Sequence, residues 1–153
     1  RTIYIRHFQS LDIAYTRLLP DVAETLAEVK NRGFLQALAT NKTVSEAERI
    51  LFELGVSDYF DLMAGFMTVA KPKPEPDMIL YTLEKLGVAP CEAIFVDDTN
   101  VGLTAGIRAG VQSIGITTGN NTYEQIQSVN PTTIIQKFSD IPKIIALHSE
   151  TTP

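Results

Sequence analysis

The chain has 153 residues with 44% hydrophobic and 20% charged side chains, which is the composition of one ordinary globular domain rather than of a disordered chain. The net charge of −5, from 13 Lys and Arg against 18 Asp and Glu, disfavours a nucleic-acid-binding protein, and no apolar run approaches the ~18–20 residues of a membrane-spanning helix. The lone cysteine, Cys91, excludes an internal disulfide framework and suits a reducing compartment, so we expect a cytoplasmic protein. The charge and the short apolar runs lead us to expect no binding to nucleic acid or to a membrane.

Helical and strand-like patterns alternate along the chain from residue 20 onward. Capping signals mark several boundaries, such as the capping box Thr43-Val44-Ser45-Glu46 and the Gly residues that follow three helical segments. The patterns predict helices at residues 21–31, 44–54, 76–86, 101–110, 123–129 and 140–148, and strands at 34–39, 60–64, 93–96, 111–116 and 133–135. Such alternation predicts an α/β fold with a mainly parallel sheet and helices on both faces. Residues 1–19 do not fit it and are expected to be helical.

Three polar segments follow apolar runs. They are Thr40-Asn41-Lys42, the loop that holds Lys71 and Lys73, and the pair Asp97-Asp98. Because the carboxyl ends of parallel strands meet at one edge of a sheet, we expect a hydroxyl, an ammonium and two carboxylates to converge there. Mg²⁺ is usually held by one or two carboxylates together with water and a substrate phosphate, and a nearby Lys neutralises the transferring phosphoryl group. The set therefore indicates phosphoryl transfer.

Each segment also has a purely structural explanation. Thr40-Asn41-Lys42 alone is typical of a helix N-cap region, Lys73 alone of a solvated loop, and Asp97-Asp98 alone of an exposed cap for the following helix. The order and spacing of the three segments, taken together, favour the functional interpretation.

With these three segments in this order, the chain resembles the haloacid dehalogenase-like (HAD) phosphatases, specifically the phosphoglycolate-phosphatase-like branch. The resemblance covers nearly everything from Leu19 to about Gly119. The strand that ends in Thr40-Asn41-Lys42 is similar to the family's second motif, and Lys73-Pro74-Glu75-Pro76 is similar to its third. Phe95-Val96-Asp97-Asp98 resembles the fourth motif in its paired-acid form. The resemblance implies a three-layer Rossmann-like core.

The resemblance also implies a role for each matching residue. Thr40 and Lys73 would be catalytic, and Thr40, Asn41 and Lys73 would bind the phosphorylated substrate. Asp97 and Asp98 would hold Mg²⁺, with Asp98 the safer assignment. Lys71-Pro72-Lys73-Pro74 fits the third motif as well. Lys73 is preferred because its distance from the end of the next helix resembles the family's spacing, and Lys71 stays an alternative.

One part of the family's pattern is absent. Family members carry an Asp-x-Asp motif after an apolar strand near the N-terminus, and its first Asp is the nucleophile. Here Asp12 stands alone, with Ala14 where the second acid would be. The resemblance then implies that residues 1–19 are a remnant of a helical cap domain and that 20–153 form an incomplete core without its central first strand. We expect the chain alone to be inactive and unstable, to swap segments with a copy of itself, or to pair with a missing N-terminal segment.

Two functions follow as hypotheses. The first is a Mg²⁺-dependent phosphatase that hydrolyses a small phosphomonoester, phosphoglycolate-like, through an aspartyl-phosphate. The second is a non-catalytic relative that only binds phosphate and metal. A response-regulator receiver domain ranks far behind, because there the acidic pair precedes the Thr and Lys in the chain, whereas here Thr40 and Lys73 precede Asp97.

Overall fold

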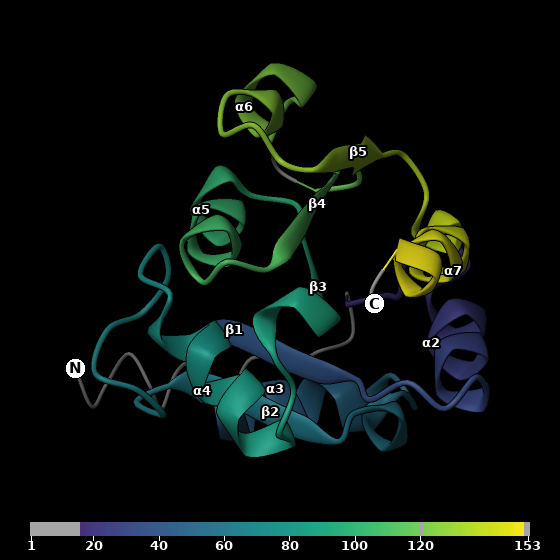
Figure 1. Ribbon diagram of the computed structural model, residues 1–153. Helices are drawn as coiled ribbons and strands as arrows, with labels where there is room; N and C mark the ends of the chain where they lie inside the picture. The colour runs from purple at the N-terminus through teal and green to yellow at the C-terminus, as the bar shows by residue number, and fades with distance from the viewer. Residues whose placement is uncertain (1–15, 120, 152–153) are drawn as a thin grey trace.

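The computed structural model describes residues 16–119 and 121–151, and Figure 1 shows how their helices and strands are arranged. The α-helices of these residues are α2 (Val22–Asn31), α3 (Val44–Glu53), α4 (Asp77–Leu86), α5 (Asn100–Arg108), α6 (Tyr123–Gln127) and α7 (Ile141–Thr151). The strands are β1 (Ala37–Thr43), β2 (Leu62–Phe66), β3 (Ile94–Asp97), β4 (Gln112–Ile116) and β5 (Thr133–Ile135). Every element expected beyond residue 20 is present. The helix expected over residues 1–19 lies mostly outside the described residues, and its described part, 16–19, is not helical.

The first strand differs from its expected range of 34–39, since β1 begins at Ala37 and continues through Thr43. Its pairing with β2 is regular from Ala37 to Ala39 and shifts before Thr43, so residues 40–42 lie in an irregular stretch of the strand. Thr43 then caps α3, because its hydroxyl accepts from the Glu46 N–H while the Glu46 carboxylate accepts from the Thr43 N–H. The expected capping box is confirmed, and residues 40–42 are not the cap of α3.

The strands form two parallel sheets rather than one. β1 pairs with β2, and β3, β4 and β5 pair in that order. Within residues 16–119 and 121–151, β1 and β3 do not pair with each other, so each keeps one edge without a strand partner. The expected α/β class with parallel strands is confirmed, and the sheet is divided between β1 and β3.

Burial of the strands follows this division. β4 lies between β3 and β5 and is buried at four of its five positions, with Ile114 at 0% exposure. Every residue of β3 is only half-buried, and so are residues 37–40 of β1. Strands of parallel sheets are ordinarily buried on both faces. The unpaired edges of β1 and β3 therefore leave strand backbone partly open to solvent.

Hydrophobic clusters cover both faces of the strands. One cluster joins α2 and α7 to β4 and β5, through Val29, Ile114, Ile116, Ile135, Ile141 and Ile145. The other joins α4 to α5, through Ile79, Leu83, Ala105, Ala109 and Val111. Side chains of β3 alternate between them, since Ile94 and Val96 pack on the first cluster and Phe95 on the second. Ala39 of β1 packs on the second cluster too, so this cluster holds the two sheets together.

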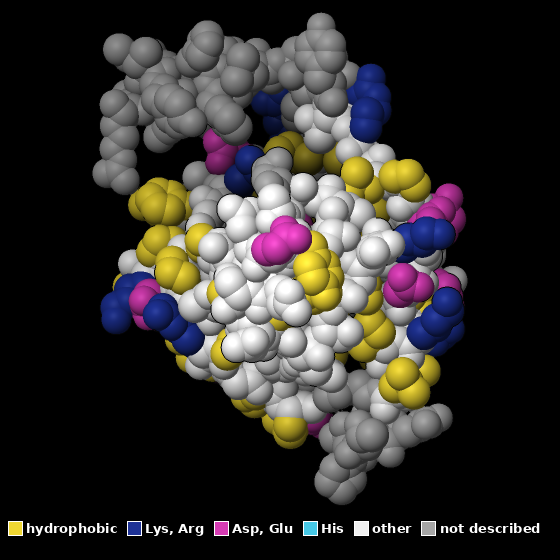
Figure 2. Space-filling view, turned by 90° about the horizontal axis from the view of Figure 1, so that it is seen from above, with side chains coloured by type: hydrophobic (Ala, Val, Ile, Leu, Met, Phe, Trp, Pro, Cys, Tyr) yellow, Lys and Arg dark blue, Asp and Glu magenta, His cyan; other side chains and the backbone are white. Residues whose placement is uncertain are grey.

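The surface carries mixed charge. Figure 2 shows Lys and Arg side chains of the described residues next to Asp and Glu side chains around the rim of one face, with hydrophobic side chains in small separate groups. The described residues on this face form no continuous basic strip of the kind that tracks a nucleic-acid backbone. No helix in residues 16–119 and 121–151 has the length and hydropathy that a membrane span requires.

The Asp61 side chain links α2 to the residue that precedes β1 through hydrogen bonds. Its carboxylate accepts hydrogen bonds from Lys30 Nζ and, at 2.8 Å, from the Gln36 N–H. The Lys30 ammonium first, and then the Gln36 N–H, lower the pKa of the Asp61 carboxyl because both contacts stabilise its charged form. A lowered pKa means that this stabilisation is fully present above the unfolded pKa of about 4 and is lost as pH falls through the folded value.

Asp61→Asn is expected to lower the free energy of unfolding by about 1 kcal/mol near neutral pH, because partly exposed charge-assisted hydrogen bonds contribute about that much. The difference between the two proteins should shrink as the pH falls from about 5 to about 2. Urea denaturation at a series of pH values measures it, with exposed Asp58→Asn as the control. A difference that stays constant across this range would contradict the assignment.

Candidate functional site

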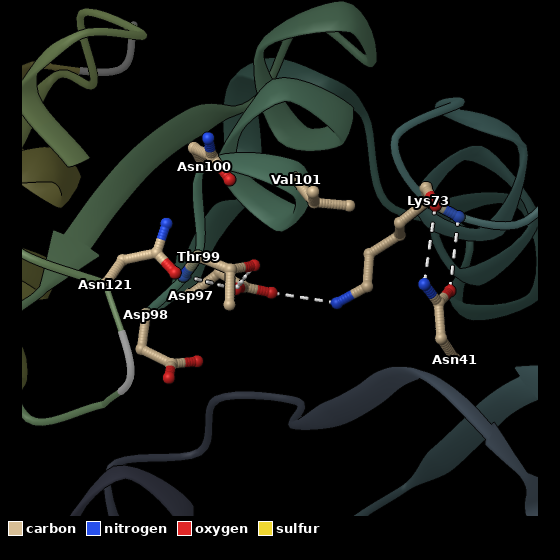
Figure 3. A pocket seen from close by; sticks show the side chains of 8 residues that line it. All are labelled: Asn41, Lys73, Asp97, Asp98, Thr99, Asn100, Val101 and Asn121. Atoms are coloured by element: carbon tan, nitrogen blue, oxygen red, sulfur yellow. Dashed lines mark hydrogen bonds and ion pairs between the residues drawn. The ribbon is translucent and has the colours of Figure 1, made fainter. Parts of the chain in front are cut away.

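A polar cavity of about 360 Å³ lies where β1, β3 and the first turn of α5 approach one another (Figure 3). The residues that line it are Asn41, Lys73, Asp97, Asp98, Thr99, Asn100, Val101 and Asn121. Four of the five residues assigned from the sequence are among them, namely Asn41, Lys73, Asp97 and Asp98. Segments that lie far apart in the chain therefore meet at one edge of the strands, as the parallel topology predicts.

Lys73 and Asp97 form the centre of the cavity. The Lys73 ammonium lies 2.8 Å from Asp97 Oδ2, and the two side chains are only 11% and 9% exposed. The other oxygen, Oδ1, accepts from the Thr99 N–H at 2.9 Å and from the Thr99 hydroxyl at 2.7 Å. The Lys73 ammonium also lies 5.5 Å from the centre of the Phe95 ring. Three donors thus fix the Asp97 carboxylate, which is the condition under which a buried ion pair is stable.

Glycines make room for both carboxylates. A Cβ on Gly102 would lie 2.0 Å from Asp97 Cγ, and a Cβ on Gly119 would lie 1.6 Å from Asp98 Oδ2. Since atoms cannot approach so closely, only Gly allows the backbone to pack directly against the two acids at these positions. Gly102 belongs to the first turns of α5, and Gly119 belongs to the loop that follows β4.

Asn41 and Arg108 hold the loop around Lys73. The Asn41 amide donates to the Lys73 carbonyl at 3.4 Å and accepts from the Lys73 N–H at 3.2 Å. Arg108, in the last turn of α5, donates to the Pro74 carbonyl at 3.2 Å and to the Glu75 carboxylate at 2.9 Å. The loop is therefore bound both to the end of β1 and to α5.

Thr40, which the sequence assigned to the site, and Lys71, the alternative to Lys73, do not line the cavity in the described residues. Thr40 is not among the described residues that line the cavity, and its hydroxyl accepts from the Lys42 N–H at 3.2 Å. Lys71 is exposed and does not line the cavity either, whereas Lys73 pairs with Asp97. The geometry thus favours Lys73 over Lys71, and the role of Thr40 stays a prediction.

The donor set suits a hard cation in part. Asp97 and Asp98 supply carboxylate oxygens, which Mg²⁺ prefers, and Mg²⁺ is commonly bound by only one or two carboxylates with water and phosphate completing its shell. Residues 16–119 and 121–151 contain no cluster of three or more His, Cys, Asp or Glu side chains placed to bind a metal. These residues therefore fit Mg²⁺ as two of its ligands and not as a complete cage.

Sequence reasoning did not single out Thr99, Asn100, Val101 or Asn121 as lining residues. Thr99 directly follows Asp98 and is the N-cap of α5, and Asn100 and Val101 begin that helix, so their position could have been found from the strand-to-helix boundary. Asn121 comes from the loop after β4, and its side chain faces Thr99 and the two acids in Figure 3. Only the order of β3 and β4 in the sheet brings this loop to the cavity.

Gly102→Ala is expected to lower the free energy of unfolding by about 1–3 kcal/mol, because its methyl group would displace the Asp97 carboxylate and loosen its bonds to Lys73 and Thr99. Urea denaturation measures the loss. The neighbouring Val101→Ala is the control, with an expected change within about 0.5 kcal/mol because Val101 is 41% exposed. Equal stability of the Gly102→Ala protein and the parent would show that this contact is not needed.

Known proteins match both the sequence and the fold. The family model described as haloacid dehalogenase-like hydrolase matches residues 1–116. The phosphoglycolate phosphatase of Aquifex aeolicus is 34% identical over 146 residues, which are 95% of this chain and 67% of that protein. That of Escherichia coli K12 is 33% identical over 151 residues, which are 98% of this chain and 60% of that protein. The chain thus spans between about half and two thirds of the length of the curated relatives it matches.

Solved structures give the same result. The crystal structure of a predicted phosphoglycolate phosphatase from Haemophilus somnus superposes with a TM-score of 0.83 at 31% identity, over 94% of this chain and 62% of that one. A haloacid dehalogenase-like family hydrolase from Streptococcus pneumoniae has a TM-score of 0.83 at 23% identity, over 94% of this chain and 67% of that one, which shows the shared fold. With the family model and the relatives in agreement, the chain belongs to the haloacid dehalogenase-like hydrolases, in the phosphoglycolate-phosphatase-like branch that its three motifs indicate.

Proposed function

We propose that this chain supplies most of the active site of a Mg²⁺-dependent phosphatase, which hydrolyses a small phosphomonoester of the phosphoglycolate type. The observation that carries the proposal is the Lys73–Asp97 pair, with its 2.8 Å contact and its 11% and 9% exposure, in one cavity with Asp98. Relatives named phosphoglycolate phosphatase, at 33–34% identity over nearly the whole chain, support it. A cytoplasmic location belongs to the same proposal, since the single exposed Cys91 suits a reducing compartment.

Each residue has a part in the proposed reaction. The Lys73 ammonium neutralises charge that develops on the phosphoryl oxygens, and it does so from a site largely shielded from water. Asp97 and Asp98 would hold Mg²⁺, which when bound orients the phosphate and adds positive charge beside it. The Thr40 hydroxyl and the Asn41 N–H would bind phosphoryl oxygens. Asp97 also pairs with Lys73, so replacing it would disturb the lysine as well as the proposed metal site, and Asp98 is therefore the residue chosen for the test.

The nucleophile must come from another strand. The full sequence contains no Asp-x-Asp pair. The unpaired edges of β1 and β3 offer a place for one additional parallel strand, whose carboxyl end would lie beside Lys73 and Asp97. We infer that an apolar segment ending in the nucleophilic Asp occupies this place and forms the aspartyl-phosphate. An N-terminal segment of the same protein could provide the strand, either within one copy or by exchange between two copies.

Phosphate release from 2-phosphoglycolate and p-nitrophenyl phosphate, measured with and without Mg²⁺ on this chain and on the intact gene product, tests the activity. In an active protein, Lys73→Met and Asp98→Asn are each expected to lower kcat at least about 100-fold, the usual effect of removing one charged group that stabilises the transition state. Lys85→Met and Asp140→Asn are the controls, since neither residue lines the cavity. Full activity of the Asp98→Asn protein would reject the metal assignment.

Hydrogen exchange tests the proposed strand. In this chain alone, amides of β3 are expected to exchange faster than those of β4, because β3 has a partner on one edge only. Adding the apolar strand as a separate peptide should slow exchange in β1 and β3 and leave β4 unchanged. Mass spectrometry of peptic fragments measures both effects, and sedimentation shows whether a second copy supplies the strand. Equal protection of β3 and β4 in a monomer without the peptide would contradict this proposal.

A non-catalytic relative is the second candidate, and an intact gene product that also has no Asp-x-Asp pair would favour it. Calorimetric titration with inorganic phosphate in the presence of Mg²⁺ separates the two functions. Binding without turnover in the intact gene product would establish the binding function, whereas turnover would exclude it.

A further inference from the structure

The loop that carries Lys73 lies outside the helices and strands of the described residues, yet its backbone is fixed at consecutive positions. Asn41 bonds both the N–H and the carbonyl of Lys73, and Arg108 bonds the carbonyl of Pro74. Figure 3 shows the two parallel contacts between the Asn41 amide and the Lys73 backbone. A side-chain amide offers one acceptor oxygen and donor N–H groups, so it can bond a backbone N–H and carbonyl together, as a neighbouring strand would.

These contacts determine where the Lys73 side chain begins. The lysine stem has four rotatable bonds and loses considerable rotamer entropy when its ammonium is confined. In this structure the stem extends from a loop bound to β1 and reaches Asp97 at the end of β3, where the ammonium lies 2.8 Å from Oδ2. Fixing the backbone of Lys73 limits the positions that its ammonium can reach.

We propose that Asn41 is a positioning residue, whose amide sets the Lys73 backbone so that the ammonium stays at Asp97 and inside the cavity. The inference rests on the proposed function only in that Lys73 is the residue that neutralises the phosphate. It gives the Asn41 side chain a task separate from the substrate-binding role assigned to this position from the sequence. Both the oxygen and the nitrogen of the Asn41 amide bond to the Lys73 backbone, so the side chain would act on the phosphate through Lys73.

Amide hydrogen exchange of Lys73, followed by NMR on the 153-residue chain without any substrate, tests the inference. Asn41→Ala is expected to speed exchange of the Lys73 amide about fivefold to tenfold, the factor that corresponds to the net contribution of one hydrogen bond. Asn121→Ala is the matched control, because it removes the same amide from the same cavity and leaves Asn41 in place. Asn41→Asp keeps an acceptor for the Lys73 N–H, so it should restore much of the protection.

Chemical labelling of the Lys73 amine gives a second readout. Competitive acetylation, quantified by mass spectrometry against Lys85 in the same sample, is expected to be slow at Lys73 in the parent because its side chain is only 11% exposed. Labelling of Lys73 should rise several-fold in Asn41→Ala and stay unchanged in Asn121→Ala. A purely structural loss would instead speed exchange throughout β1 and lower the melting temperature.

Unchanged protection and labelling of Lys73 in Asn41→Ala would overturn the inference. A second result would also overturn it. In that result, the Lys73 amide loses as much protection in Asn41→Asp as in Asn41→Ala, and all β1 amides exchange faster in both variants. Because no phosphate ester is present, these results are independent of the phosphatase assay. A chain that shows the expected exchange pattern but whose intact gene product releases no phosphate would reject the proposed function and retain the positioning role of Asn41.

Discussion

The ion pair between Lys73 and Asp97 joins two sheets that, in residues 16–119 and 121–151, have no strand pairing between them. Lys73 belongs to a loop bound to the end of β1, and Asp97 ends β3 in the other sheet. Both side chains are about one-tenth exposed. Removing one member of a buried ion pair lowers the free energy of unfolding by about 3–5 kcal/mol, because the other charge is left without a partner. The same contact that links the two sheets also places a cation and a carboxylate in the cavity.

The division of the sheet explains the unusual exposure of its strands. β4 has partners on both edges and is almost wholly buried, whereas β3 and the first part of β1 are half-buried. Helices α4 and α5 pack over the division, with Ala39 and Phe95 in contact with the same cluster. The helical layer therefore keeps the two sheets side by side, while among the described residues β1 and β3 each have a strand partner on one edge only. The cavity lies beside this division, since Asn41 of β1 and Asp97 of β3 both line it.

Close backbone packing and polar contacts together shape the site. Gly102 and Gly119 bring backbone directly against Asp97 and Asp98, where a Cβ atom would clash with the carboxylates. Thr99 adds two donors to Asp97, and the amide of Asn41 fixes the loop of Lys73. A site of this kind is organised before any ligand binds, which is the condition under which charged groups stabilise a transition state most effectively.

Local signals in the sequence were sufficient for most of the secondary structure. The capping box at Thr43, the glycine after α4 and the apolar run of β3 are properties of short segments, so their positions follow from the residues alone. The order of the three motifs, through resemblance to a family, also led us to expect Lys73, Asp97 and Asp98 to lie close together, and all three line one cavity. The predicted start of β1 was wrong by three residues. The Gln36 N–H just before β1 donates to the Asp61 carboxylate, a partner distant in sequence that no local pattern indicates.

Tertiary structure alone decided which groups share the cavity. Lys71 and Lys73 both fit the third motif, and the spacing to the next helix favoured Lys73. The path of the loop then places Lys73 beside Asp97. Asn121 enters the cavity because β4 lies next to β3, a neighbour relation that no local pattern encodes. The sequence by itself determined the elements and the residue types available for phosphoryl transfer, since these depend on interactions between near neighbours. Distances between charges depend on how whole elements pack, and packing is settled only when the chain has folded.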